Sequence, residues 1–147
     1  MTKWWVLIYI TLSVVLFSPQ LFSGGDNAVY IILAQSLVSG HGYRDLHLVG
    51  EPVHRTYPPG FPLSLCPFIA LFDYNLIVLK VVMVLWGLAA VLIFDKITRL
   101  LLPPPFGSLA MIAFLLTPAL YTYSHSVLSD VPYMTLSLGA IYFMVRK

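Results

Sequence analysis

The chain has 147 residues, of which 59% are hydrophobic and 10% are charged, and its formal net charge is +2. Soluble domains are about 45–50% apolar and about 25% charged, so this composition predicts an integral membrane protein. The small net charge, with basic residues spread along the chain, indicates no nucleic-acid partner. The single cysteine, Cys66, excludes a disulfide framework and a cysteine-based zinc site.

Four apolar segments predict transmembrane helices, so we expect an all-α integral membrane fold. A helix needs about 20 residues to cross the hydrocarbon, and the segments that approach this length are residues 4–22, 76–94, 106–122 and 131–145. The first segment follows Lys3, and a cleaved signal peptide is the alternative there. Because the fourth segment ends at Arg146 and Lys147, we expect the chain to be the N-terminal portion of a larger polytopic domain.

The polar interruption over residues 23–75 is predicted to be a large outer loop that contains one or two interfacial helices. Residues 26–37 fit a short amphipathic helix that Asp26 can cap. Gly40 and Gly42 follow, where a left-handed residue commonly ends a helix. A second short helix is expected over residues 61–72, because Pro58 and Pro59 cannot lie inside a helix.

The basic residues predict the orientation of the chain. With the N-terminus inside, the cytoplasmic ends carry Lys3, Lys96, Arg99, Arg146 and Lys147, which follows the positive-inside rule. The outer loop then faces the periplasm of a bacterium, with the inner membrane as the expected location, or the lumen in a eukaryote. Lys80, inside an apolar segment, is expected to extend its amine toward the membrane surface; contact with an anionic head group is the alternative.

Two acids are candidates for catalysis, each at the start of a predicted helix on the outer face. Asp26 follows two glycines, and Asp130 precedes the fourth apolar segment. A helix cap is the structural alternative for both residues. The functional interpretation is that the two carboxylates converge on one site, with Asp26 at the lipid–water boundary as a general base.

A substrate-binding group is predicted just before the double-proline turn. Arg55 offers a guanidinium that suits phosphate, and His54 and Tyr57 lie beside it in the chain; a solvated loop is the alternative. Asp45 and Glu51 are expected to be solvated. The remaining histidines, His41, His47 and His125, lack an i, i+4 spacing, so the sequence indicates no metal site and no certain cofactor.

The order of these motifs resembles the N-terminal part of membrane-embedded glycosyltransferases of the GT-C class. The similarity is greatest to the protein-mannosyltransferase-like and lipid A aminoarabinose-transferase-like group. The motifs that carry it are Gly25-Asp26-Asn27-Ala28, residues 34–43, Tyr57-Pro58-Pro59-Gly60-Phe61 and Ser129-Asp130-Val131-Pro132.

The resemblance implies that Asp26 and Asp130 are the catalytic acids, that the sugar donor is a polyprenyl phosphate and that the acceptor is a lipid, protein or glycan. Family members commonly carry an acidic pair at the first position, whereas this chain has Asp26-Asn27. Some relatives bind a divalent metal through a glutamate before the Pro-Gly turn, and no glutamate matches it here. A divalent metal therefore stays open. The alternative function is a non-catalytic polytopic membrane protein, such as an assembly or transporter subunit.

Overall fold

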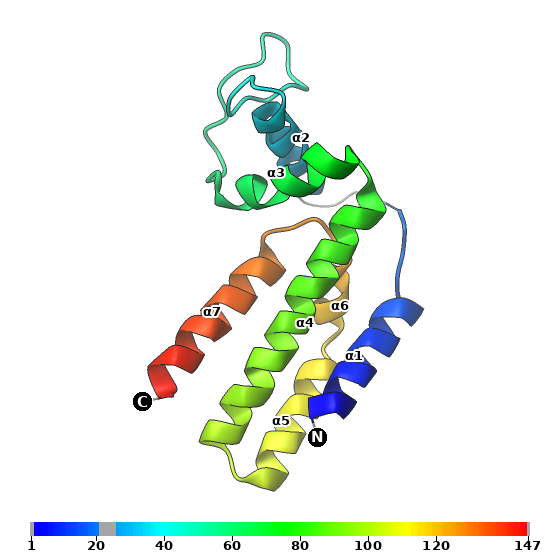
Figure 1. Ribbon diagram of the computed structural model, residues 1–147, viewed down its shortest axis with the longest axis vertical. Helices are drawn as coiled ribbons and strands as arrows, with labels where there is room; N and C mark the ends of the chain where they lie inside the picture. The colour runs from blue at the N-terminus through cyan, green and yellow to red at the C-terminus, as the bar shows by residue number, and fades with distance from the viewer. Residues whose placement is uncertain (1, 21–25, 147) are drawn as a thin grey trace.

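The computed structural model describes residues 2–20 and 26–146, which form helices joined by loops (Figure 1). The helices of these residues are α1 (Thr2–Val15), α2 (Asn27–Val38), α3 (Gly60–Phe72), α4 (Leu76–Leu101), α5 (Pro104–Leu115), α6 (Pro118–Ser124) and α7 (Asp130–Val145). The loop between α2 and α3 contains one isolated antiparallel bridge, between Arg44 and Val53. The prediction of an all-α fold is confirmed.

The long helix α4 is the axis of the molecule. It packs against α1, α5, α6 and α7, while α2 and α3 lie near its N-terminal end (Figure 1). The Asn75 side chain caps it, because its Oδ1 accepts hydrogen bonds from the backbone N–H groups of Ile77 and Val78 at 3.1 and 3.2 Å. The helix contains 26 residues, about 39 Å at 1.5 Å per residue, which exceeds the ~30 Å hydrocarbon core. The helix ends at Leu101, beyond the predicted end at residue 94.

The prediction of four continuous spans is not supported. Within the described ranges, α4 is the one helix that is long and apolar enough to cross a membrane by itself. Helix α1 has 14 residues and α7 has 16. Helices α5 and α6 reach sufficient length only together, and they are bent by 51° at the break between them.

Proline explains two of these interruptions, because it removes a backbone donor and disfavours helix at the residue before it. Pro118 begins α6 after the break, and α1 ends at Val15, shortly before Pro19. The predicted end of the first span, at Phe22, and the first residues of the predicted outer loop lie outside the described residues.

Lys80 also departs from the prediction, because its amine does not reach the surface. The residue is 1% exposed. Its Nζ donates to the carbonyl oxygen of Ser18 at 2.7 Å and to that of Gln20. The end of α1 supplies these acceptors by leaving the helical conformation, so the amine finds polar partners inside the protein instead of extending outward.

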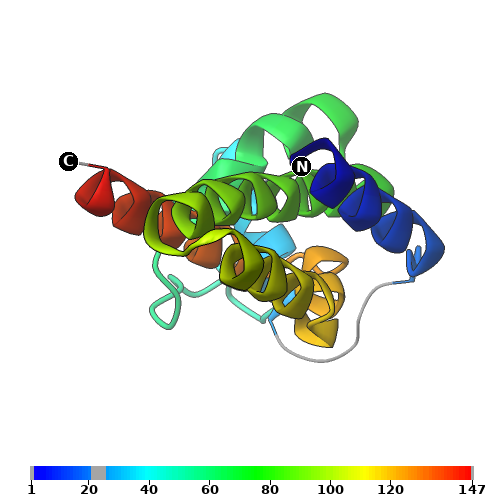
Figure 2. The same cartoon turned by 90° about the horizontal axis from the view of Figure 1, so that it is seen from below.

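Two apolar clusters hold the helices together. The first joins α2, α3, the N-terminal half of α4 and the loop before α7; its buried members are Tyr30, Ile31, Ala34, Leu65, Ile69, Leu79, Val82, Met83, Val127 and Leu128. The second joins α1, α4, α5 and α6; its buried members are Tyr9, Val91, Met111, Leu115, Leu120 and Tyr121. Figure 2 shows α7 projecting on the side away from α1.

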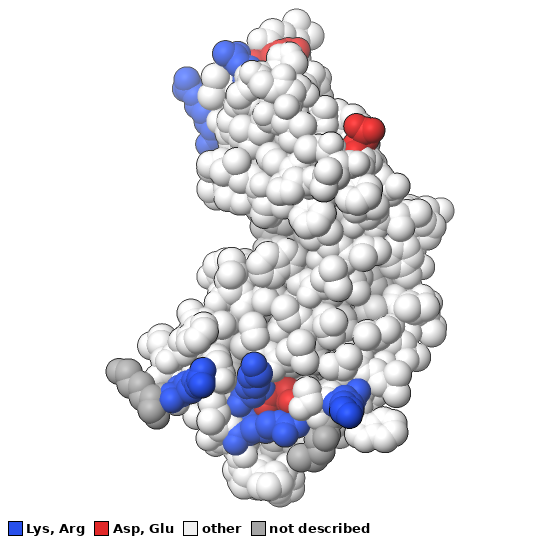
Figure 3. Space-filling view, viewed as in Figure 1, with Lys and Arg blue, Asp and Glu red and all other residues white. Residues whose placement is uncertain are grey.

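The predicted outer loop forms a compact cap in which α2 packs against α3. Both predicted short helices are confirmed, and Gly40 and Gly42 have φ of 77° and 78° after α2, as the predicted left-handed end requires. In Figure 3 the charged side chains gather toward the two ends of the visible face, and the surface between them is uncharged.

Candidate functional site

Asp26 directly precedes α2, but its carboxylate does not cap that helix. Its backbone carbonyl accepts the first helical bond, from the N–H of Tyr30 at 3.0 Å. The hydroxyl of Tyr57, just before α3, interacts with the carboxylate, and this interaction is the main cause that raises the pKa of Tyr57. The side chain is half-buried. Asp26 therefore interacts with Tyr57, another predicted site residue. Its side chain does not cap α2, which was the structural alternative.

The Tyr57 phenol is held in its protonated form by this pairing. Its hydrogen bond to the Asp26 carboxylate, followed by burial and by the negative charge of Asp26, raises the pKa of Tyr57 above its ordinary range. The Asp26 carboxylate and the Tyr57 phenol are therefore partners in this site.

The backbone of Tyr57 is anchored on both sides. Its N–H donates to Nε2 of His54 at 2.9 Å, and its carbonyl oxygen accepts from the hydroxyl of Tyr43 at 3.0 Å. The His54 ring stacks on the Tyr57 ring with centroids 5.3 Å apart and planes at 20°. These contacts restrain Tyr57 in a segment whose two prolines already limit the backbone.

His54 is buried, and both of its ring nitrogens have partners inside the loop. Because Nε2 accepts from a backbone N–H, the ring proton resides on Nδ1, which donates to Oδ1 of Asp45 at 2.8 Å. This arrangement leaves no ring nitrogen of His54 for a substrate. We therefore assign His54 to positioning Tyr57. Asp45 was expected to be solvated, and that expectation is wrong, since its side chain is 14% exposed and paired with His54.

Arg55 is exposed on the surface of the outer loop, next to buried His54. The fixed ring of His54 thus anchors the backbone on one side of Arg55, and Tyr57 anchors it on the other. Because the Arg55 side chain is exposed, its guanidinium is accessible to a phosphate.

Tyr30 connects the loop to the start of α7, where Asp130 lies. Its ring contacts those of Tyr57 and Phe61, with centroids 5.2 and 4.9 Å away. Its hydroxyl lies 3.3 Å from Oγ of Ser129, with either oxygen able to donate. Two neighbouring pairs, Asp26–Tyr57 and Tyr30–Ser129, thereby bring the beginning of α2 and the beginning of α7 into one region.

Asp130 is exposed and is the first residue of α7, and the Ser129 side chain makes no capping bond. The carboxylate lines a cavity of about 130 Å³ together with Thr117 and Tyr123. Among the described residues, no group of three or more His, Cys, Asp or Glu side chains is arranged to hold a metal ion.

The residues that sequence reasoning missed are Tyr30, Tyr43 and Asp45. They support the predicted residues through contacts that span 9 to 99 positions in the chain, and no local motif indicates them. Comparison of the chain with protein-family models, with curated proteins and with solved structures found no match.

Proposed function

We propose that the chain is the N-terminal part of a membrane glycosyltransferase that moves a sugar from a polyprenyl phosphate to a hydroxyl-bearing acceptor. The observation that carries the proposal is the Asp26 carboxylate, which caps no helix and interacts with the Tyr57 phenol. A general base must be held in reach of the proton that it removes, and a carboxylate that caps no helix can serve in that role.

In this mechanism the acceptor hydroxyl gives its proton to Asp26 as its oxygen attacks the anomeric carbon of the sugar. The new carbon–oxygen bond forms as the bond to the phosphate oxygen breaks, and the configuration at that carbon inverts. The leaving polyprenyl phosphate takes the electron pair as an anion, so it needs a cation more than an acid. Arg55 supplies that cation, and Asp130 orients the acceptor from the other side.

The membrane placement belongs to the same proposal. Helix α4 crosses the bilayer, with α1, the bent pair α5–α6 and α7 beside it as further membrane segments. The ends that carry Lys3, Lys96 and Arg99 face the cytoplasm, and the loop with Asp26 faces the periplasm across the bacterial inner membrane. The uncharged band between the charged ends of the molecule supports this arrangement (Figure 3).

The proposal is tested in membranes from cells that express the protein as encoded, supplied with polyprenyl-phosphate sugars labelled at the anomeric carbon. We expect label in an acceptor fraction, absent from membranes without the protein, and NMR of the product should show the inverted anomeric configuration. Retained configuration would contradict the single displacement. Absence of transfer with every donor, together with normal folding, would favour the non-catalytic alternative.

A further inference from the structure

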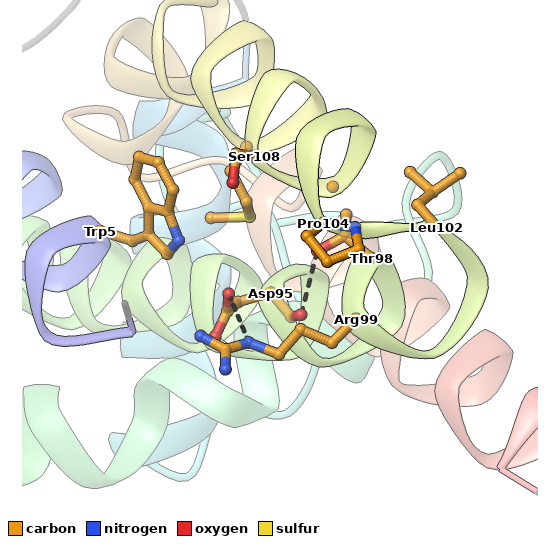
Figure 4. A pocket seen from close by; sticks show the side chains of 9 residues that line it. Trp5, Asp95, Thr98, Arg99, Leu102, Pro104 and Ser108 are labelled. Atoms are coloured by element: carbon orange, nitrogen blue, oxygen red, sulfur yellow. Dashed lines mark hydrogen bonds and ion pairs between the residues drawn. The ribbon is translucent and has the colours of Figure 1, made fainter.

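A second cavity, of about 130 Å³, lies where α1, α4 and α5 meet, and nothing in the proposed reaction uses it. It is near the C-terminal end of α4, whereas the loop with Asp26 lies near the N-terminal end of that helix (Figure 1). Polar side chains enter it from all three helices: Trp5 from α1, Asp95 and Arg99 from α4, and Ser108 from α5 (Figure 4).

The acid in this cavity is already fully paired. Oδ1 of Asp95 accepts from Nε of Arg99 at 3.0 Å, and Oδ2 accepts from the hydroxyl of Thr2 at 2.8 Å. Asp95 is 3% exposed, so its charge faces Arg99 and not solvent. The two charges of the Asp95–Arg99 pair offset each other, so the pair neither repels nor strongly attracts an anion by net charge, and its free N–H groups are what it offers a ligand.

Several donors in the cavity remain available. Nη2 of Arg99 donates to Thr2 at 2.9 Å, while Nη1 has no hydrogen bond within residues 2–20 and 26–146, and the Arg99 side chain is 45% exposed. The indole N–H of Trp5 and the hydroxyl of Ser108 also have no partner in the part of the chain that the structure describes. Figure 4 shows the nitrogen edge of the Trp5 ring turned toward Asp95 and Arg99. A guanidinium, an indole N–H and a hydroxyl together suit a phosphate.

The surroundings match an anionic amphiphile. Lys96 and Arg146 lie over the ring of Tyr142, 5.6 and 5.8 Å from its centroid, so this end of the molecule gathers further positive charge (Figure 3). Trp4 on α1 and Phe106 on α5, which are next in sequence to the lining residues Trp5 and Gly107, have side chains that are 67% and 61% exposed. An anionic head at Arg99 would therefore leave its hydrocarbon chains against apolar helix surfaces.

We propose that this cavity binds the phosphate head of an anionic membrane phospholipid. Arg99 contacts the phosphate oxygens, Trp5 and Ser108 donate to them, and the acyl chains lie along α1 and α5. The inference relies on the placement of α4 across the membrane, but not on glycosyl transfer, so a catalytically inactive protein would still bind the lipid.

The experiment is native mass spectrometry of the detergent-purified protein with phosphatidylglycerol, with phosphatidylcholine and with inorganic phosphate. We expect phosphatidylglycerol to be retained in preference to both. Loss of one charge-assisted hydrogen bond corresponds to about a tenfold weaker affinity, so Arg99→Gln should weaken binding by about tenfold or more. Trp5→Phe and Ser108→Ala, which leave the Asp95–Arg99 pair intact, should each weaken it several-fold.

The matched controls are Lys96→Gln and Arg146→Gln, which remove one positive charge from the same end but do not line the cavity. They should change binding much less than Arg99→Gln. Equal losses for all three variants would show attraction by diffuse charge and overturn the proposed site. Binding of inorganic phosphate in competition with the lipid, or full binding by the Trp5→Phe/Ser108→Ala double variant, would also overturn it. Melting curves without lipid separate lost binding from lost folding.

Discussion

Replacing Gly87 by alanine places a methyl group where α1, α4 and α6 come closest together. A Cβ at this position would overlap the hydroxyl of Tyr9 and lie 2.6 Å from Oγ of Ser124. Neither neighbour can retreat easily. Tyr9 is fully buried, and its hydroxyl donates to the carbonyl oxygen of Val84 at 3.1 Å and lies within hydrogen-bond distance, 3.2 Å, of Oγ of Ser124. The substitution therefore forces a shift of α1 or breaks these bonds.

The expected magnitude follows from three terms. Overpacking costs about 1–3 kcal/mol, and loss of the Tyr9 hydrogen bond costs about 1 kcal/mol. Alanine in a helix interior returns about 1 kcal/mol relative to glycine. We expect Gly87→Ala to lower the free energy of unfolding by about 1–3 kcal/mol, measured by SDS titration in mixed micelles. Gly139→Ala is the control, because a Cβ there meets no atom within 4 Å.

The clash itself can be tested by combining variants. Tyr9→Phe removes the atom that the new methyl group overlaps, so it should cost less stability in the Gly87→Ala background than in the wild type. If Gly87→Ala changed the free energy of unfolding by the same amount as Gly139→Ala, the clash would be disproved. Additive effects of Gly87→Ala and Tyr9→Phe would contradict the proposed contact even if each variant were destabilised.

Three further predictions concern buried or paired polar groups. Lys80→Met should lower the thermal midpoint because it leaves two backbone carbonyls unpaired, whereas exposed Lys96→Met should not. Because Asp26 raises the pKa of Tyr57, this phenol stabilises the fold below pH about 10. That contribution is lost as pH rises through the raised pKa, and ultraviolet titration of Asp26→Asn should show Tyr57 ionising at lower pH. Burial, followed by the charge of Lys80, lowers the pKa of His125. Stability should therefore fall as pH drops below about 6.5, and His125→Gln should reduce this dependence in melting curves.

The two helices of the cap, α2 and α3, could be predicted from sequence because their signals are local. Glycines end α2, and the Pro58-Pro59 pair sets the beginning of α3 to within one residue of the expected position. The lengths of the apolar helices α1 and α4 could not be predicted from apolarity alone. Both α1 and α4 belong to continuous apolar runs, and Pro19 shortens one whereas the other continues past residue 94 to Leu101.

The candidate site was predictable in its members but not in its connections. Asp26 and Tyr57 stand out by their positions beside turn residues. The interaction between them joins residues at opposite ends of the loop, and no local signal predicts it. The pairing of His54 with Asp45 depends on the fold of residues 43–57, which brings two side chains nine positions apart together. Such contacts depend on tertiary structure, so sequence spacing alone assigned Asp45 to solvent and His54 to substrate.

Asp26→Asn is the decisive variant, because the proposed reaction requires the Asp26 carboxylate to remove a proton from the acceptor. The measurement is the turnover of sugar transfer from a polyprenyl-phosphate donor, per folded molecule, in membranes containing the protein as encoded. We predict a loss of about 100-fold or more, with a thermal midpoint lowered only by the loss of the Tyr57 interaction, because the carboxylate caps no helix. The exposed loop acid variant Glu51→Gln should retain activity. Near wild-type turnover of Asp26→Asn, or a loss no greater than its loss of folded protein, would contradict the account.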